Sequence, residues 1–221
     1  MKVVSVATAD SRAYYSILSR LKKTNLHFVS LTPSQAVSEQ REPVITTKKE
    51  LDFFNEVTSI PIEELDENPL IMEGQILSRM FKEDKRTILV GVDPGSRIGI
   101  VVFYGSVELG SLTVNSLDSL LGKISNVVRE IPHVKAVVKV GDGAARMSDA
   151  IASGISREFP EVLVEIVDEK GTSMIGTKFK GLTRDQSAAT RIAFRKGSVF
   201  RQHYVGRQQS PGIQSPGLSA R

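Results

Sequence analysis

The sequence contains no cysteine. This absence excludes disulfide frameworks, thiolate metal sites and cysteine nucleophiles, so any bound metal must be held by oxygen or imidazole. Long apolar runs are also missing: none approaches the roughly 18 to 20 residues that cross a bilayer, and the apolar N-terminal stretch is too short for a signal peptide. The remaining composition, 40% hydrophobic and 24% charged, is typical of an ordinary globular protein. We therefore expect a cytoplasmic protein with no membrane partner.

Acidic residues are scarce in the last part of the chain. Residues 170–221 contain ten Lys and Arg but a single acid, Asp185, whereas residues 1–169 contain 19 basic and 24 acidic residues. A basic segment attached to an acidic body is typical of a protein that contacts a polyanion, because each cation near a phosphate releases condensed counterions. On charge alone, a solubilising basic tail is an equal alternative. The basic segment has few aromatic residues, which argues against a base-stacking platform and favours contacts with the nucleic-acid backbone.

The first half of the chain has the pattern of a small α/β unit. An apolar strand near residues 3–6 is followed by Asp10, which we expect to cap a helix, and by a second strand at 26–31. The loop before this helix has no glycine-rich phosphate motif, so we prefer the capping role to a phosphate site. A third short strand near 44–46 and a helix near 48–57 complete the pattern.

Composition divides the chain into four parts. Two prolines and four acids at 59–69 indicate a connector, and the last residues are rich in Gly, Pro, Ser and Gln, which is typical of disorder. We predict a small α/β domain at 1–69, a linker helix at 70–86, a second domain at 87–197 and a disordered basic tail at 198–221.

The second domain has the clearest secondary-structure signals. Three β-branched runs follow one another and are separated by turn residues, and two helix–strand units and a final helix come after them. This order, β-β-β-α-β-α-β-α, predicts a mixed five-stranded sheet. The strands are expected at 88–92, 98–104, 107–114, 134–140 and 162–167, and the helices at 116–130, 144–159 and 184–195.

The order of elements and three motifs together resemble the ribonuclease-H-like superfamily, and within it the RuvC and YqgF branch of Holliday junction resolvases and related nucleases. The motifs are VGVDPGSRIGIVVF at 90–103, VDEKGTS at 167–173 and RDQSAATRIA at 184–193. The resemblance covers about residues 87–197. It implies a ribonuclease-H-like fold, a nuclease activity that depends on Mg²⁺ or Mn²⁺, and DNA or RNA as partner. Resolvases of this type act as dimers, so a homodimer is also open.

Acidic residues stand at the ends of the expected strands. Asp93 ends the first strand of the domain, Asp142 the fourth, and Asp168 and Glu169 the fifth, while Asp185 begins the last helix. The first and fourth strands are expected to be neighbours, which brings their carboxylates together. Clustered carboxylates need a counter-charge, and oxygen ligands suit Mg²⁺ or Mn²⁺, two of which can promote phosphodiester hydrolysis without a nucleophilic side chain.

Each of these acids also has a structural interpretation. Asp93 precedes Pro-Gly, and its role could simply be to begin a turn. Asp142 lies between two glycines and could cap a helix. In the resemblance the position of Asp142 normally holds Glu, or no acid in YqgF-type proteins, where Glu169 is favoured instead. Asp185 could simply be an acid that the helix dipole stabilises in the first turn. We predict Asp93, Asp142, Glu169 and Asp185 as catalytic residues, with Asp168 as a further metal ligand.

Four basic residues near these acids are candidates for phosphate contacts: Lys170, Lys178, Lys180 and Arg184. A solvated flexible loop is the alternative for the lysines. For the whole chain, the first hypothesis is a metal-dependent nuclease. The second is a non-catalytic nucleic-acid-binding protein that retains the fold, and the third is a phosphate binder of the actin-like ATPase type.

Overall fold

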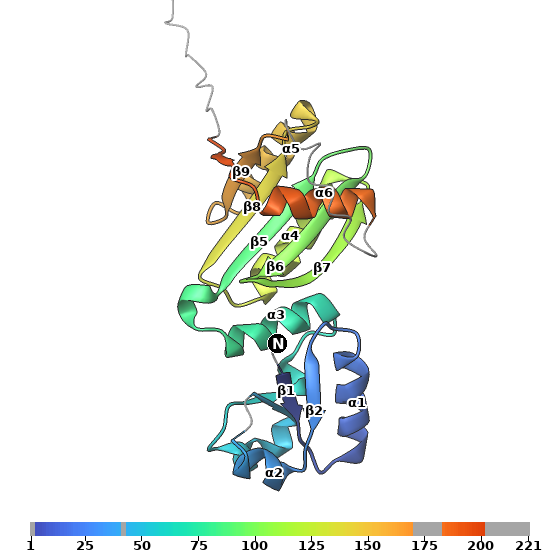
Figure 1. Ribbon diagram of the computed structural model, residues 1–221, viewed down its shortest axis with the longest axis vertical. Helices are drawn as coiled ribbons and strands as arrows, with labels where there is room; N and C mark the ends of the chain where they lie inside the picture. The colour runs from blue at the N-terminus through green and yellow to red at the C-terminus, as the bar shows by residue number, and fades with distance from the viewer. Residues whose placement is uncertain (1–2, 41–42, 170–182, 202–221) are drawn as a thin grey trace, which may run out of the picture.

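The chain folds around two β-sheets with a helix between them. The computed structural model describes residues 3–40, 43–169 and 183–201. In Figure 1 the four-stranded sheet of the first half lies at one end, the six-stranded sheet of the second half lies at the other, and helix α3 (Pro69–Met80) separates them. None of the helices in these ranges is long and apolar enough to cross a membrane.

The N-terminal sheet is parallel, with the strand order β2-β1-β3-β4. Its first helix begins at the predicted cap: Asp10 accepts hydrogen bonds from the backbone N–H groups of Arg12 and Ala13. The helix expected at 48–57 is a 3₁₀ helix instead, because Glu50 N–H bonds the carbonyl three residues back, that of Thr47. The elements are β1 (Val3–Val6), α1 (Ser11–Leu21), β2 (His27–Ser30), α2 (Pro33–Ser38), β3 (Val44–Thr46), η1 (Lys48–Phe54), β4 (Ser59–Pro61) and η2 (Ile62–Glu64).

Helix α3, at the start of the predicted linker 70–86, is a packed core element. Asn68 caps it and Pro69 occupies its first turn. Gln75 connects both halves of the chain: its Oε1 accepts from the N–H of Asp66 at 2.9 Å, and its Nε2 donates to the carbonyl of Glu130 at 3.0 Å. One continuous hydrophobic cluster includes residues of α1, α3 and both sheets. The two halves therefore share a core.

The C-terminal sheet confirms the predicted mixed α/β fold class, and its strand order is consistent with a ribonuclease-H-like fold. Its strand order is β10-β9-β8-β5-β6-β7, in which β5, β6 and β7 form an antiparallel meander and β8 and β9 run parallel to β5. The pairing of β5 with β8 is the predicted adjacency of the first and fourth strands. A 3₁₀ turn, η3 (Glu83–Lys85), leads into these elements: β5 (Thr87–Asp93), β6 (Ile98–Tyr104), β7 (Val107–Val114), α4 (Leu117–Glu130), β8 (Lys135–Gly141), α5 (Ala145–Glu158), β9 (Leu163–Val167), α6 (Arg184–Ala193) and β10 (Ser198–Val199).

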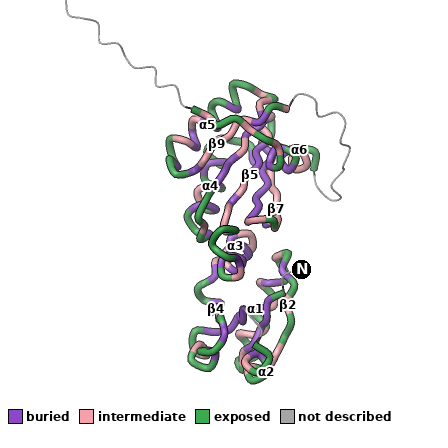
Figure 2. Tube along the Cα trace, turned by 60° about the vertical axis from the view of Figure 1, so that its left-hand side comes forward, coloured by how far each residue is buried: buried purple, intermediate pink, exposed green. Residues whose placement is uncertain are grey.

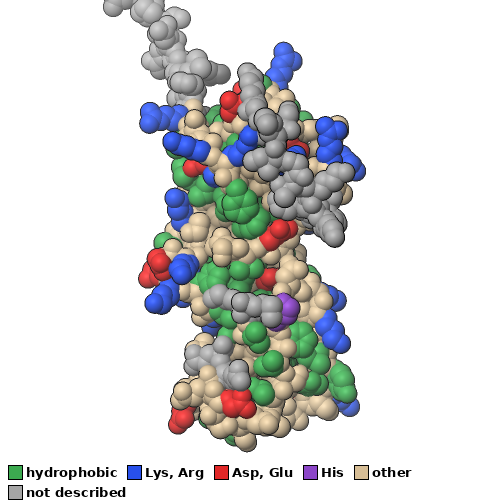
Figure 3. Space-filling view, in the orientation of Figure 1, with side chains coloured by type: hydrophobic (Ala, Val, Ile, Leu, Met, Phe, Trp, Pro, Cys, Tyr) green, Lys and Arg blue, Asp and Glu red, His purple; other side chains and the backbone are tan. Residues whose placement is uncertain are grey.

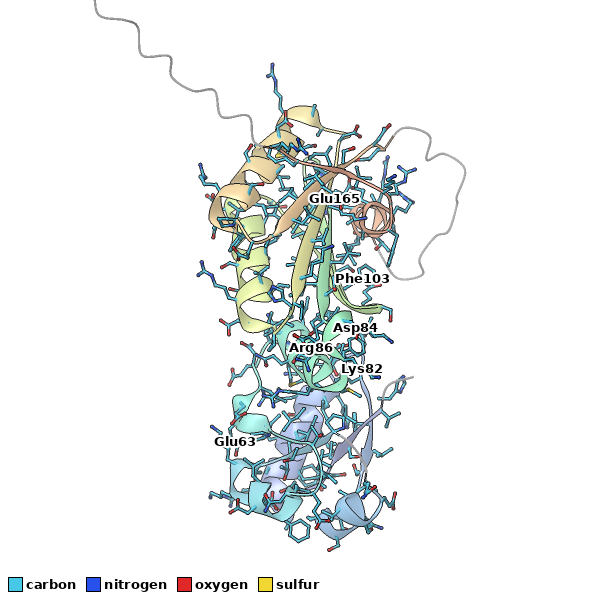
Figure 4. All side chains as sticks on the ribbon, turned by 90° about the vertical axis from the view of Figure 1, so that its left-hand side faces the viewer. Glu63, Lys82, Asp84, Arg86, Phe103 and Glu165 are labelled. Atoms are coloured by element: carbon cyan, nitrogen blue, oxygen red, sulfur yellow. The ribbon has the colours of Figure 1, made fainter. Side chains whose placement is uncertain are left out.

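Helices cover both faces of this sheet. Viewed edge-on in Figure 4, α4 and α5 lie on one side and α6 on the other, with Phe103 and Glu165 on the α6 side. Successive side chains of β5 lie on opposite faces of the sheet. Val90 belongs to the main core, whereas Leu89 packs with Val101, Phe103 and α6 on the other face. The central strands are buried along most of their length (Figure 2). By this alternation Asp93 faces α6.

A sixth strand corrects the predicted boundary of the tail. Ser198 and Val199 pair antiparallel with β9, and the N–H of Phe200 bonds the carbonyl of Val164 at 2.9 Å. Phe200 also packs against the main core. Residues 198–201 therefore belong to the fold, because an aromatic anchor and ladder hydrogen bonds hold them. The rest of the predicted tail lies outside the described residues.

Candidate active site

Asp93 ends the central strand of the C-terminal sheet. It pairs across the ladder with Gly99 of β6, and buried Pro94 then ends the strand pairing. The side chain is half-buried on the face that α6 covers. Open α/β sheets place their ligands at the carboxyl ends of such strands, so the position suits a functional group.

Two glycines allow α6 to approach this part of the sheet closely. A Cβ on Gly91 would lie 2.9 Å from Cβ of Ala193, and a Cβ on Gly99 would lie 2.6 Å from the carbonyl carbon of Asp185. Thr183 begins α6 with a capping box that it shares with Gln186. Asp185, in the first turn, is thereby held over the strand that pairs with Asp93.

The pKa of Asp93 is raised to about 6. Burial is the largest cause, the negative charges of Glu169 and Asp185 come next, and Arg191 and Arg184 oppose the shift. The structure thus brings three of the predicted acids into one electrostatic neighbourhood, together with the predicted Arg184. In Figure 3 further Lys and Arg side chains gather around this end of the C-terminal sheet.

Asp142 and Glu169 hold each other in place at the ends of β8 and β9. The Oδ1 of Asp142 accepts from the N–H of Glu169 at 2.9 Å, and the Oε1 of Glu169 accepts from the N–H of Gly143 at 3.0 Å. Gly141 leaves room for that carboxylate, since a Cβ there would overlap it. Asp142 is not among the charges that shift the pKa of Asp93. In this structure Asp142 positions Glu169 through the backbone.

The remaining predicted site residues lie in different surroundings. Asp168 is exposed, and its backbone carbonyl accepts from Nη1 of Arg195 at 2.9 Å. Lys170, Lys178 and Lys180 lie outside the described residues. Arg184 is exposed at the start of α6. Only Arg184 of the four predicted phosphate contacts can therefore be placed.

Two basic residues of the site were not predicted. Arg97 lies in the turn between β5 and β6, and its Nη2 is 3.2 Å from Oδ2 of Asp185. Arg191, on α6, lowers the pKa of Asp93. Arg191 could have been predicted from the sequence. It follows Arg184 by seven residues, or two helical turns, and so lies on the same face of the helix.

The acids fit a divalent cation that needs few protein ligands. Among the described residues, no three His, Cys, Asp or Glu side chains form a group that could hold a metal ion. Mg²⁺, however, is usually held by one or two carboxylates and takes its other ligands from water and substrate phosphate. The carboxyl of Asp93 is half-buried, and burial together with the charges of Glu169 and Asp185 raises its pKa, so a cation would stabilise its ionised form. The acids are therefore suited to a cation that one or two carboxylates hold, and not to one that protein ligands enclose.

A second group of polar residues lies at one end of the N-terminal sheet and is joined by hydrogen bonds. At the carboxyl ends of β1 and β3, the carboxylate of Glu50 accepts from the hydroxyl of Thr8 at 2.5 Å, the N–H of Ala9 at 2.7 Å and the hydroxyl of Thr47 at 2.7 Å. The hydroxyl of Thr46 lies at 3.3 Å. These bonds lower the pKa of Glu50 against the effect of burial. These four donors are thus bound by a carboxylate of the chain itself.

Comparison with known proteins covers the two halves differently. A family model described as a response regulator receiver-like domain matches residues 3–72, which include the four-stranded parallel sheet. No curated protein matches the sequence. Among solved structures, an Argonaute of Marinitoga piezophila in complex with a guide RNA and target DNA is similar over 76% of this chain and 39% of its own, with 10% identity and a TM-score of 0.31. We draw nothing about activity from a similarity this weak.

Proposed function

We propose that this chain is a metal-dependent nuclease that hydrolyses phosphodiester bonds of nucleic acid, related to the RuvC and YqgF branch of ribonuclease-H-like proteins. The observation that carries the proposal is the environment of Asp93. Its carboxyl is half-buried at the end of the central strand, and burial, Glu169 and Asp185 together raise its pKa to about 6. A shift of this kind is concentrated at functional sites, because such a carboxylate is costly until a cation or substrate group compensates it.

Each residue then has a role in the proposed site. Asp93, with Glu169 or Asp185, would hold Mg²⁺ or Mn²⁺, and the bound cation supplies positive charge and an activated water to phosphodiester hydrolysis. Asp142 orients Glu169 through the hydrogen bond to its N–H. No nucleophilic side chain is required.

Basic residues would bind the nucleic-acid backbone around the acids. Arg184 and Arg191 act on Asp93 from α6, so a phosphate that reaches Asp93 also meets their charge. Contacts of this kind position a strand without reading its sequence. Lys170, Lys178 and Lys180 would extend the same path, and a homodimer, as in resolvases, stays a prediction.

Cleavage of labelled branched and linear DNA and RNA in Mg²⁺ or Mn²⁺ tests the proposal. Asp93→Asn, Glu169→Gln and Asp185→Asn are each expected to lower the rate at least about a hundredfold, since each removes charge that acts in the reaction. Glu158→Gln is the matched control, because Glu158 is exposed in the last turn of α5, at the far end of the sheet. Equal rates in the variants and the wild type would refute the site.

A second candidate is a nucleic-acid-binding protein without catalysis. The observation in its favour is that the described residues contain no ready group of three metal-ligating side chains. In that case the wild type binds nucleic acid with a steep salt dependence but leaves every substrate of the panel intact. Cleavage that disappears in Asp93→Asn decides for the nuclease.

A further inference from the structure

The acidic site already holds a positive charge on the chain itself. Nη2 of Arg97 lies 3.2 Å from Oδ2 of Asp185, and the pair joins the turn after β5 to the first turn of α6. The side chain of Asp185 is 22% exposed and that of Arg97 is 64% exposed. Asp185 is thus held in the site, whereas the guanidinium reaches it from the solvent side.

This ion pair adds little to the attachment of α6. The helix is already packed on the sheet through Gly91, Gly99 and the cluster of Val101, Phe103, Ala189 and Ala193. An ion pair with a mostly exposed partner contributes little stability. A role as a structural clip therefore explains the position of Arg97 poorly.

The chemistry of the pair points to a role toward cations and phosphates. A guanidinium remains charged at every physiological pH and forms paired hydrogen bonds with either carboxylate or phosphate oxygens. While it faces Asp185, it repels a metal ion from that carboxylate. A phosphate of an incoming strand offers it an equivalent partner, and an exposed side chain can change partners without movement of the backbone.

We propose that Arg97 is the resident cation of the site: it occupies Asp185 in the free protein, limits the acids to one divalent ion, and pairs with a backbone phosphate when nucleic acid binds. This inference rests on the proposed function and assigns a positioning residue to it. It also accounts for a site in which two further acids act on Asp93, although no group of three metal-ligating side chains is present among the described residues.

Calorimetric titration with Mn²⁺, in the absence of nucleic acid, tests the first half of the inference. The wild type is expected to bind one ion, and Arg97→Gln to bind Mn²⁺ about fivefold tighter or to bind a second ion, as expected when a partly exposed charge is removed. Arg97→Lys keeps the charge and is expected to behave as the wild type. Arg157→Gln, an exposed residue in the last turn of α5, is the control and should change nothing.

Binding of a short duplex DNA, and of an RNA duplex of the same sequence, in EDTA over a series of salt concentrations tests the second half. Arg97→Gln is expected to weaken binding and to reduce the slope of log K against log salt by about one, the value for one phosphate contact. An Mn²⁺ affinity and a salt slope equal to those of the wild type, in a wild type that does bind Mn²⁺, would overturn the role of Arg97 and leave the nuclease proposal intact. A wild type that neither binds Mn²⁺ nor cleaves would instead overturn the nuclease proposal itself.

Discussion

Gly91 of β5 and Ala189 of α6 are in direct contact: a methyl group on Gly91 would overlap the backbone carbonyl oxygen of Ala189. The same methyl would lie 2.9 Å from Cβ of Ala193. The distance between helix and sheet is therefore set by the absence of a side chain at position 91. Asp185, at the other end of α6, depends on this distance for its place near Asp93.

Gly91→Ala is expected to lower the free energy of unfolding by about 1 to 3 kcal/mol, the usual cost of an overpacked contact. Urea unfolding at pH 7 measures it. Gly122→Ala is the matched control, because a Cβ on this residue of α4 would meet nothing within 4 Å, and alanine should stabilise an exposed helix by up to about 1 kcal/mol. Loss of stability in both variants, or in neither, would contradict the close contact at Gly91.

The raised pKa of Asp93 predicts a pH-dependent gain in stability from Asp93→Asn. In the folded state the carboxyl becomes charged only near pH 6, whereas in the unfolded chain it ionises near its ordinary value. Its charge therefore costs stability above about pH 6 and costs nothing below the unfolded pKa. We expect the variant to be about 1 to 2 kcal/mol more stable at pH 8, a figure reduced for the partial exposure of the group.

Urea unfolding of both proteins at pH 3.5 and pH 8 measures this difference. The gain should vanish at the lower pH, where both side chains are neutral. A gain of the same size at both values would trace it to packing and not to charge. Glu158→Gln, at an exposed site, should show no comparable pH-dependent gain.

The lowered pKa of Glu50 predicts that its contribution to stability depends on pH in the opposite sense. Its pKa is lowered by hydrogen bonds from Thr8, Ala9, Thr47 and Thr46, so its ionised form stabilises the fold above the unfolded pKa, and this stabilisation is lost as the pH falls through the folded pKa. Glu50→Gln is expected to cost about 1 to 3 kcal/mol at pH 7 and progressively less in acid. Thermal unfolding across pH measures it, with exposed Glu56→Gln as control. An equal loss at every pH would contradict the role of the charge.

Much of the fold could be predicted because local pattern and tertiary structure agree. The strands at Ile98–Tyr104 and Val107–Val114 are β-branched runs bounded by turn residues, and their predicted bounds are those observed. The parallel pairing of β5 with β8 also follows from the order of elements and is observed. The order of elements does not predict contacts between side chains and backbone groups, such as the hydrogen bond from the N–H of Glu169 to Asp142.

Other features depend on contacts that no local pattern encodes. The ion pair of Arg97 with Asp185 exists because two glycines let α6 lie close to the sheet. Strand β10 has two residues, too few for a period, and Phe200 fixes it only once the core has formed. The 3₁₀ helix at Lys48–Phe54 carries Glu50, whose carboxylate accepts a hydrogen bond from the hydroxyl of the distant residue Thr8.

The most direct test of the account is Mn²⁺ binding by the full chain at pH 7.5, measured by calorimetry for the wild type, Asp93→Asn and the control Glu158→Gln. If Asp93 is the central carboxylate of a cation site, the wild type and the control bind one ion with the same affinity, and Asp93→Asn binds none while it remains folded. Equal binding by Asp93→Asn and the wild type, or no binding by any of the three proteins, would contradict the account.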